Sequence, residues 1–249
     1  MRNVRLFPIA WFVVALLLLG AASCKKKSND NPFGNVRIAT VDVTHGGAIE
    51  HYRLYYDTYN NIDSMSITGD GTASGQFGFR KFNYFGSSWT VTDEGNFTFT
   101  VYANTAGVLL KVLIADTLTY SYENNQLTQL TQYVPTTTPP YHSISTTYFE
   151  WKNGDLITAT TGSIVQAYSY LTSRNGQPGD ALRLPGILNF GKPAVKTAHL
   201  PQGVATGHGQ GESYVYSFDD KGRISSLMKL ISDSSVAFHD TLTYGFSYY

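Results

Sequence analysis

The chain has 249 residues, with 18 Lys and Arg, 18 Asp and Glu, and a single Cys. One cysteine excludes an intramolecular disulfide framework. The balanced charge lacks the basic excess typical of nucleic-acid binders, so we expect no nucleic-acid partner. Hydrophobic residues make up 42% of the chain and aromatic residues 14%. This content favours a packed core over wholesale disorder.

The amino terminus has the order of a secretory signal peptide. Two arginines precede an apolar run over residues 6–19, and small residues then lead to Cys24. The run is shorter than the roughly 20 apolar residues of a membrane span. Residues 21–24, Ala-Ala-Ser-Cys, resemble a lipobox, whose cysteine is acylated after cleavage. We therefore expect residues 1–23 to be a lipoprotein signal peptide and Cys24 to carry a lipid that anchors the protein to a membrane. A general signal peptide followed by a chance cysteine is the alternative.

A polar segment separates this leader from the rest of the chain. Residues 25–32 contain three consecutive lysines and no apolar side chain, which is typical of a flexible tether. Removal of the two leader arginines leaves 16 basic against 18 acidic groups, so the mature chain stays close to neutral. We expect residues 24–35 to be a tether and residues 36–249 to form a single β domain.

From Val36 onward, apolar side chains recur at every second position. The alternation is clearest at residues 52–56, 118–122, 214–218 and 242–248. A period of two indicates half-buried strands with one face toward a core, and we find no convincing helical stripe in the mature chain. The pattern predicts an all-β fold, a single antiparallel meander sheet of a dozen or more strands curled into a barrel-like fold. A two-sheet β-sandwich is the alternative.

Turn residues separate these strands. Asn and Gly tolerate the positive φ angles that tight hairpins need. We therefore expect hairpin turns at Asn60-Asn61, residues 104–107, Asn124-Asn125, Asn153-Gly154 and residues 219–222. The sequence Asp-Thr-Leu-Thr-Tyr also occurs twice, at residues 116–120 and 240–244. This echo suggests that the sheet repeats one hairpin module.

One long stretch departs from the strand pattern. Residues 172–212 contain four prolines and eight glycines, which predicts a long loop with short, broken strands. Long loops often carry function, so this loop is the first place to look for a site. A crossover packed on the end of the sheet is the alternative. The loop holds the weak metal-ligand candidates His199, His208 and Glu212, but their spacing matches no recognised metal-binding motif. We predict no cofactor.

Two further features lie toward the end of the mature domain. Residues 214–227 join a Tyr-rich strand, an Asp/Gly turn and an Ile/Leu strand, and Lys196 is followed by Leu200-Pro201 shortly before this last hairpin. In both respects the domain resembles a family of Bacteroidota lipoproteins of unknown function that are described as having a porin-like fold. The resemblance implies a secreted β-sheet lipoprotein and no assigned activity. We expect it at the bacterial outer membrane, on the periplasmic or the cell-surface side.

Sequence motifs for catalysis are absent or incomplete. Residues 186–193 match a phosphate-binding loop, except that Pro193 stands where a Ser or Thr hydroxyl must hold Mg²⁺. There is no Gly-x-Ser-x-Gly elbow, and the single cysteine is assigned to lipidation. Many Asp and Glu residues could form the carboxylate pair of a glycoside hydrolase, but their spacing selects none. Such a hydrolase is therefore an alternative without catalytic residues to name.

Aromatic side chains suggest a binding role. Trp89, Trp151, Tyr141 and Tyr148 could present flat rings with a polar edge to a sugar, whereas packing in the core is the alternative for each. We therefore expect a lipid-anchored, non-enzymatic binding or scaffold module of the cell envelope, with a glycan or another envelope protein as its partner. A purely structural envelope component is a further alternative.

The side-chain pattern of the last strand distinguishes a barrel with a filled interior from a membrane barrel. Counted back from Tyr249, the positions that would face lipid in a membrane barrel are Ser247, Gly245, Thr243 and Thr241. All are polar or very small, and the apolar residues have the other parity. The pattern favours a sheet with a filled interior over a wall that faces lipid.

Overall fold

The computed structural model describes residues 36–69, 78–103, 109–113, 117–135, 142–207, 209–234 and 238–249, all within one compact unit. This described part contains sixteen strands and one short helix, α2 (Leu184–Phe190). The strands are β1 (Ile38–His45), β2 (Ala48–Tyr56), β3 (Ile62–Gly69), β4 (Gly78–Phe85), β5 (Ser88–Thr92), β6 (Thr98–Ala103), β7 (Leu109–Leu113), β8 (Thr117–Glu123), β9 (Gln126–Pro135), β10 (His142–Lys152), β11 (Asp155–Thr161), β12 (Ile164–Asn175), β13 (His199–Thr206), β14 (Gln210–Phe218), β15 (Ile224–Asp233) and β16 (Phe238–Tyr248).

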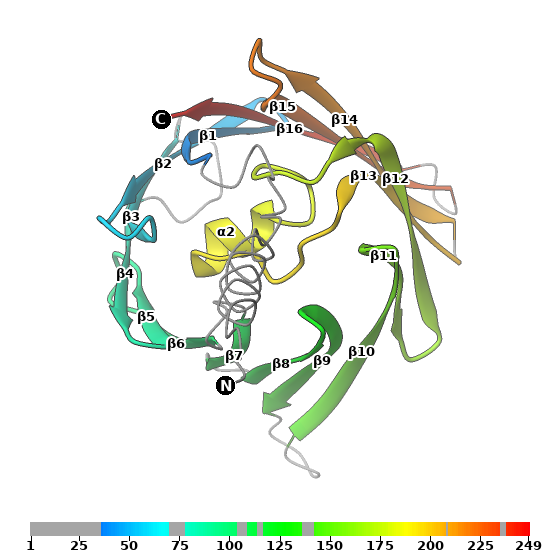
Figure 1. Cartoon of the computed structure of the whole chain (residues 1–249), viewed down its shortest axis with the longest axis horizontal. Helices are drawn as coiled ribbons and strands as arrows, with labels where there is room; N and C mark the ends of the chain where they lie inside the picture. The colour runs from blue at the N-terminus through cyan, green and yellow to red at the C-terminus, as the bar shows by residue number, and fades with distance from the viewer. Residues whose placement is uncertain are drawn as a thin grey trace, which may run out of the picture. The chain divides into compact units, whose positions relative to one another are not determined.

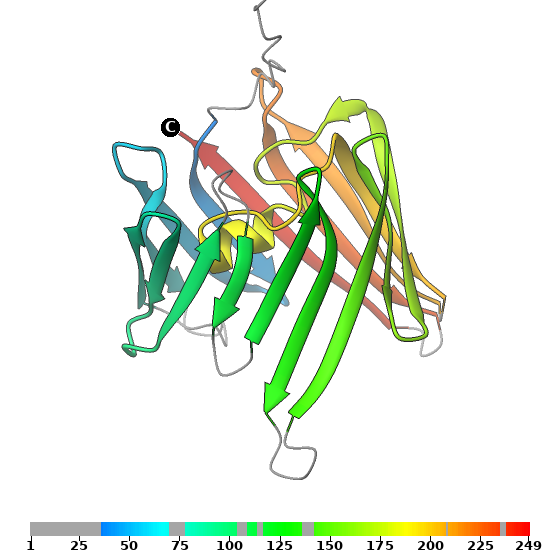
Figure 2. The same cartoon turned by 60° about the horizontal axis from the view of Figure 1, so that its bottom comes forward.

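The strands form one closed antiparallel barrel. Each strand pairs with its neighbours in sequence, and β1 pairs with β16 to complete the ring. Figure 1 looks into this ring, and Figure 2 shows the strands from the side. Closure gives every strand a partner on both edges, which removes the edges on which other chains could pair. The predicted barrel-like meander is confirmed, and the alternative of a two-sheet sandwich is wrong.

The predicted turns lie where Asn residues adopt left-handed backbone conformations. The angle φ is 64° at Asn60, 50° and 63° at Asn124 and Asn125, and 53° at Asn153. Each of these residues joins two consecutive strands. Asn is one of the few side chains that enter this region without a large steric penalty. The hairpin predictions at these positions are confirmed, and the one at residues 104–107 lies outside the described residues.

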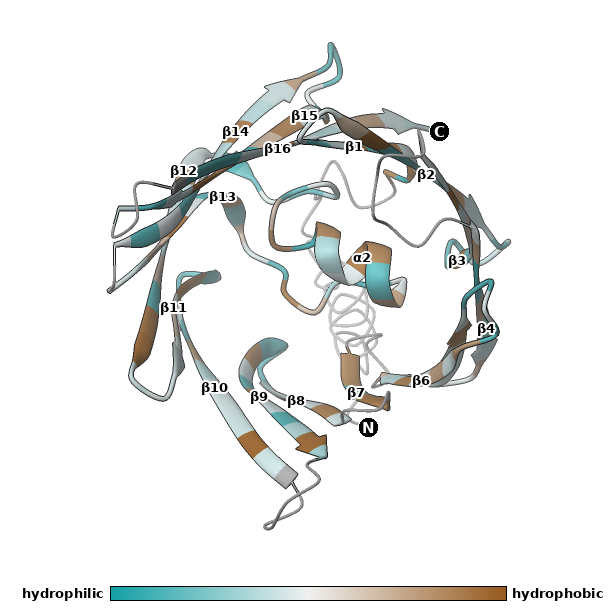
Figure 3. Cartoon of the chain, turned by 180° about the vertical axis from the view of Figure 1, so that it is seen from behind, coloured by the Kyte–Doolittle hydropathy of each residue, from teal (hydrophilic) through white to brown (hydrophobic). Residues whose placement is uncertain are grey.

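Side chains alternate between the inside and the outside of the barrel. The pairing of β1 with β16 places Val41 opposite Phe246, and both belong to or pack against the core. On the other face of the same strands, the Thr40 and Ser247 hydroxyls hydrogen-bond at 2.7 Å. Figure 3 shows apolar and polar segments alternating along several strands. The parity predicted for the last strand is confirmed, with its apolar residues facing inward.

The interior is occupied by the segment between β12 and β13, residues 176–198, which we call the inner segment. It enters the ring and forms α2 there (Figure 1). Because strand pairing extends to Asn175 and resumes at His199, the irregular stretch is shorter than residues 172–212. The helix is one the sequence pattern did not predict, since seven residues are too few to show a helical period. No helix in the described residues is long and apolar enough to cross a membrane.

Buried polar contacts attach the inner segment to the wall. The Gln177 side chain is 2% exposed and accepts the backbone N–H of Ile224 at 3.1 Å. The Trp89 indole N–H donates to the Phe190 carbonyl at the end of α2, at 2.9 Å. The Tyr122 hydroxyl donates to the Ala194 carbonyl at 3.0 Å. These wall residues come from β15, β5 and β8. The inner segment is therefore fixed at several points around the ring.

Candidate functional site

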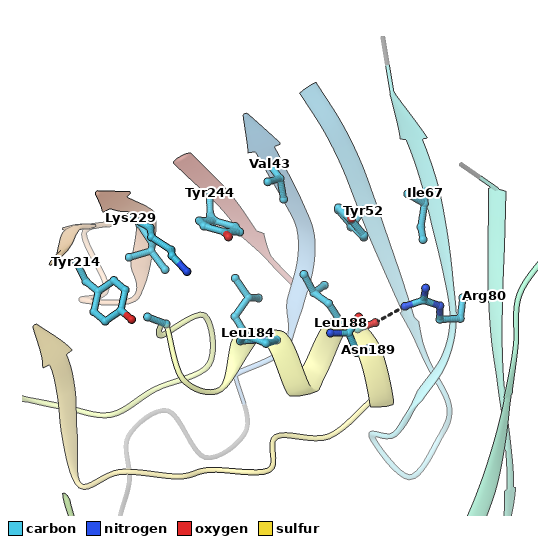
Figure 4. A pocket seen from close by; sticks show the side chains of 13 residues that line it. Val43, Tyr52, Ile67, Arg80, Leu184, Leu188, Asn189, Tyr214, Lys229 and Tyr244 are labelled. Atoms are coloured by element: carbon cyan, nitrogen blue, oxygen red, sulfur yellow. Dashed lines mark hydrogen bonds between the residues drawn. The ribbon is translucent and has the colours of Figure 1, made fainter. Parts of the chain in front are cut away.

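A cavity of about 380 Å³ lies between α2 and one side of the barrel wall. Its wall residues come from β1 to β4 and from β14 to β16, which lie next to one another only because the barrel closes. Figure 4 shows α2 beneath the cavity and the strand side chains above it. The lining residues are Val43, Tyr52, Ile67, Arg80, Ala181, Leu184, Pro185, Leu188, Asn189, Tyr214, Leu227, Lys229 and Tyr244.

Arg80 brings a positive charge to the cavity from β4. Its guanidinium donates to the Leu188 carbonyl of α2 at 2.8 Å, the bond drawn in Figure 4. Among the described residues it forms no ion pair, and Asp93 attracts it only at longer range. Burial lowers the pKa of Arg80 because the charged form loses hydration. An arginine still remains charged in a protein, so the cavity contains a partly dehydrated cation.

A second cation, Lys229 on β15, is already neutralised. Its ammonium group lies 2.6 Å from a carboxylate oxygen of Glu212. The other oxygen of that carboxylate accepts the hydroxyl of Tyr214 at 2.5 Å. Figure 4 shows Lys229 and Arg80 at opposite ends of the cavity. The charge without an ion-pair partner is therefore confined to the Arg80 end.

Three tyrosines supply further polar groups. The Tyr52 hydroxyl donates to Glu50 at 2.6 Å, whereas the Tyr244 hydroxyl has no hydrogen-bond partner among the described residues. Burial raises the pKa of Tyr52, Tyr214 and Tyr244 above the ordinary value of 10. These hydroxyls therefore keep their protons at neutral pH, and Tyr244 has a donor available for a ligand.

The lining has the composition of a small-molecule site. Its titratable side chains are three tyrosines, Arg80 and Lys229, and the other lining residues are mostly apolar. A concave site with mostly apolar and aromatic walls and a few polar groups is typical of small-molecule binding. The arrangement can exclude water, pack an apolar body and hydrogen-bond a polar group.

The two tryptophans of the predicted sugar site lie elsewhere in the barrel. Trp89 is 2% exposed, and its ring packs against Tyr84 with 5.4 Å between centroids. Trp151 is half-buried, and its indole N–H donates to the Leu127 carbonyl at 2.7 Å. The burial of Trp89 leaves no open ring face for a sugar, so the core alternative describes this residue.

The other predicted binding residues are separated from the cavity or outside the described part of the chain. Tyr148 is 57% exposed, and its position in β10 places its side chain on the outer face of the barrel. Cys24, Tyr141 and His208 lie outside the described residues. Lipidation of Cys24 and sugar binding at Tyr148 remain predictions.

The metal-ligand candidates have separate partners. The His199 ring nitrogen Nδ1 lies 2.7 Å from an Asp155 carboxylate oxygen, and Glu212 binds Lys229 and Tyr214. In the part of the chain that is described, no three His, Cys, Asp or Glu side chains gather in the manner of metal ligands. Nothing here brings His199 and Glu212 to a common centre.

The sequence analysis missed Arg80 and Lys229, although a signal was present. Arg80 has the same strand parity as Phe82 and Tyr84, and Lys229 has the parity of Leu227. A charged residue at an otherwise apolar, inward parity is uncommon unless it has a partner or a role. The long loop was a useful place to look, because its inner segment supplies α2 as one side of the cavity.

Comparison with known proteins identifies a similar fold. The chain is similar to a porin-like protein from Bacteroides uniformis ATCC 8492, with a TM-score of 0.64 and 12% sequence identity over 85% of this chain and 98% of that chain. At this identity the similarity establishes the fold alone. No family model and no curated protein matches the sequence. The porin-like fold implied by the sequence resemblance is thus supported by a solved structure.

Proposed function

We propose that this protein is a lipid-anchored, non-enzymatic binding module of the bacterial envelope that holds a small molecule inside its barrel. The observation that carries the proposal is the cavity of about 380 Å³ between α2 and the wall. Small-molecule sites have volumes of roughly 300–1,000 Å³ and mostly apolar walls with a few convergent polar groups. The cavity agrees with both properties.

The attachment of the inner segment supports a preformed site. Hydrogen bonds join the segment to two different strands, one at Gln177 near its start and one from Trp89 to Phe190 at the end of α2. A site whose walls are already fixed loses less conformational freedom when a ligand binds. The barrel is therefore suited to hold a ligand without folding around it.

The leader and the wall support a place at the outer membrane. The lipobox-like residues 21–24 would put a lipid on Cys24, and the polar tether would connect it to the barrel. The outward positions on β16 carry His, Thr, Gly or Ser, which suit contact with water better than contact with acyl chains. In this proposal the lipid, rather than the barrel wall, attaches the protein to the membrane.

A glycan or an envelope protein is a second class of partner, and the outer face of β9 and β10 favours it. Tyr133 and Ile144 face each other across these strands and are 42% and 55% exposed. Tyr148, on the same face, is 57% exposed. Exposed rings beside an aliphatic side chain offer a contact surface for a sugar or a protein.

Binding in the cavity is tested with N-phenyl-1-naphthylamine, an uncharged fluorophore that brightens in apolar sites. We expect a saturable increase in fluorescence with the full chain and its loss in Val43→Phe, because Val43 lines the cavity and a ring there fills it. Val165→Phe is the matched control, since Val165 is 45% exposed. Equal fluorescence of both variants and the native protein would place the fluorophore elsewhere and contradict the proposal.

The lipid anchor has an independent test. We expect radiolabelled palmitate to be incorporated into the protein in bacterial cells and to be lost in Cys24→Ser. Fractionation of the same cells should find the native protein in the membrane fraction and Cys24→Ser in the soluble fraction. Palmitate labelling of Cys24→Ser at the native level would contradict lipidation at this residue.

A further inference from the structure

We infer that the ligand of the cavity is an amphipathic monocarboxylate, with its carboxylate on Arg80 and its apolar body between α2 and the wall. This inference rests on the proposed function, because it names the chemical class of ligand for the same cavity. It follows from three features, which are the spare donors of Arg80, the neutralised state of Lys229 and the aliphatic lining.

Arg80 has unused capacity to bind an anion. A guanidinium has five N–H donors in a planar fork, and among the described residues Arg80 donates one hydrogen bond, to the Leu188 carbonyl. The fork matches the two oxygens of a carboxylate better than a single ammonium group does. A partly buried cation without an ion-pair partner is unfavourable, and an anionic ligand group would offset this.

The remaining polar groups select for one negative charge at one end. The carboxylate of Glu212 already holds Lys229 at 2.6 Å, so the far end of the cavity offers no second unpaired cation. The Tyr244 hydroxyl adds a neutral donor to the lining. Arg80 would repel a cationic head group. A neutral head group would leave the charge of Arg80 without an ion-pair partner. A single carboxylate satisfies these conditions.

The rest of the cavity requires an apolar body. Its aliphatic lining comes from both the strands and the helix, with Val43, Ile67 and Leu227 on the wall and Leu184 and Leu188 on α2. Val43, Leu184 and Leu188 lie between the Arg80 and Lys229 ends (Figure 4). The volume of about 380 Å³ lies in the lower part of the range for small-molecule sites. We therefore expect a ligand with one short apolar chain or ring system, not a polymer.

The test compares four probes by isothermal titration calorimetry with the full chain at pH 8. Decanoate has the proposed head and body, 1-decanol and decylamine change only the head, and acetate has only the head. We expect decanoate to bind about tenfold or more tighter than 1-decanol, as a charge-assisted hydrogen bond predicts. Decylamine should bind more weakly than 1-decanol, and acetate should give no measurable heat.

Variants then locate the head group. Arg80→Gln should lower decanoate affinity to the level of 1-decanol and leave 1-decanol affinity unchanged. Lys81→Gln is the matched control, because Lys81 is the next residue on the same strand and is exposed on its opposite face. It removes one positive charge from β4 and should bind both probes as the native protein does. Arg80→Lys keeps the charge without the fork, so we expect an intermediate decanoate affinity.

The outcomes separate this inference from the proposed function. Equal binding of decanoate and 1-decanol by the native protein would overturn the monocarboxylate assignment while leaving a cavity that binds apolar molecules. Unchanged decanoate affinity in a folded Arg80→Gln variant would overturn the role of Arg80. Failure of every ten-carbon probe, together with fluorophore binding unaffected by Val43→Phe, would remove the proposed function itself. If Arg80→Gln does not fold by circular dichroism, the native probe ranking and Arg80→Lys still decide.

Discussion

Trp89 contacts both a neighbouring wall strand and the inner segment. Its ring lies against Tyr84, and its indole N–H donates to the Phe190 carbonyl at 2.9 Å. The Lys192 ammonium group lies over the Tyr84 and Trp89 rings, 5.7 Å and 5.4 Å from their centroids. Such cation–π contacts add to the attraction. A residue that a sequence reader would assign to sugar stacking therefore stabilises the interior.

Replacement of this indole should lower stability measurably. Trp89→Phe keeps an aromatic ring but leaves the Phe190 carbonyl without its donor. We expect the free energy of unfolding in urea to fall by about 1–3 kcal/mol, the usual effect of an unsatisfied buried polar group. Tyr148→Phe, at a 57% exposed site, should change it by no more than about 0.5 kcal/mol. An unfolding free energy of Trp89→Phe equal to that of the native protein would mean that the indole hydrogen bond does not stabilise the fold.

Among the elements, the strands were predictable and the helix was not. One buried face and one exposed face impose a period of two on residues such as Tyr52, Leu54 and Tyr56, and Asn residues mark the turns between strands. The seven residues of α2 contain Pro185 and Gly186 and complete about two turns. A helix this short depends on the packing around it, which a local pattern does not contain.

Gly186 illustrates how closely the inner segment packs on itself. A Cβ atom built on Gly186 would lie 2.8 Å from the Lys192 carbonyl oxygen and 2.8 Å from the Pro193 Cα. Real Cβ atoms do not approach backbone atoms this closely. The returning chain therefore lies against α2 only because this position has no side chain. Sequence reasoning took the same glycine as part of a loop, since its role depends on residues that follow the helix.

A buried ion pair lies just before α2. The Asp180 carboxylate is fully buried and lies 3.0 Å from the Nε atom of Arg183. It also accepts the backbone N–H groups of Leu182 and Arg183 at 3.1 Å and 2.9 Å. Burial raises the pKa of Asp180 to about 6, because the loss of hydration outweighs the attraction of Arg183. The charge on this residue is therefore held at an energetic cost.

This shift predicts a pH dependence of stability. The native state holds the Asp180 proton more tightly than the unfolded chain, whose pKa is 3.8. The stability from this group is complete below pH 3.8 and is lost as the pH rises through about 6. We expect the unfolding free energy of the native protein minus that of Asp180→Asn to fall by up to about 3 kcal/mol from pH 4 to pH 7. Urea unfolding of both proteins between pH 4 and pH 7 measures this difference. A difference that does not change with pH would contradict the raised pKa of Asp180.

At the scale of the whole molecule, closure of the barrel creates the cavity. Pairing of β1 with β16 brings β4 and β15 to the same side of the interior, with Arg80 on one and Lys229 on the other. These residues are far apart in sequence, and no local spacing connects them. The barrel class could be predicted because alternation and turn chemistry are local. The strand partners across the closing seam, and hence the site, depend on long-range pairing that one sequence does not specify.

The inner face also gives the whole barrel a response to alkaline pH. Burial raises the pKa of eleven tyrosines on six strands, and to about 12 for Tyr120 and Tyr168. In the unfolded chain tyrosine loses its proton near pH 10. The unfolded state therefore binds fewer protons above this pH, so stability is retained below pH 10 and falls as the pH rises toward 12.

We expect most tyrosine ionisation in the native protein to coincide with unfolding. Absorbance at 295 nm follows tyrosinate formation, and far-ultraviolet circular dichroism follows the barrel in the same titration. The part of the absorbance change that comes from the buried tyrosines should coincide with the loss of the strand signal at a pH well above 10, because their hydroxyls ionise only when the barrel opens. In 6 M guanidinium chloride the unfolded chain should show one transition near pH 10. A native titration that is complete near pH 10 with an unchanged strand signal would mean that these tyrosines are hydrated, and the filled interior described for this barrel would be incorrect.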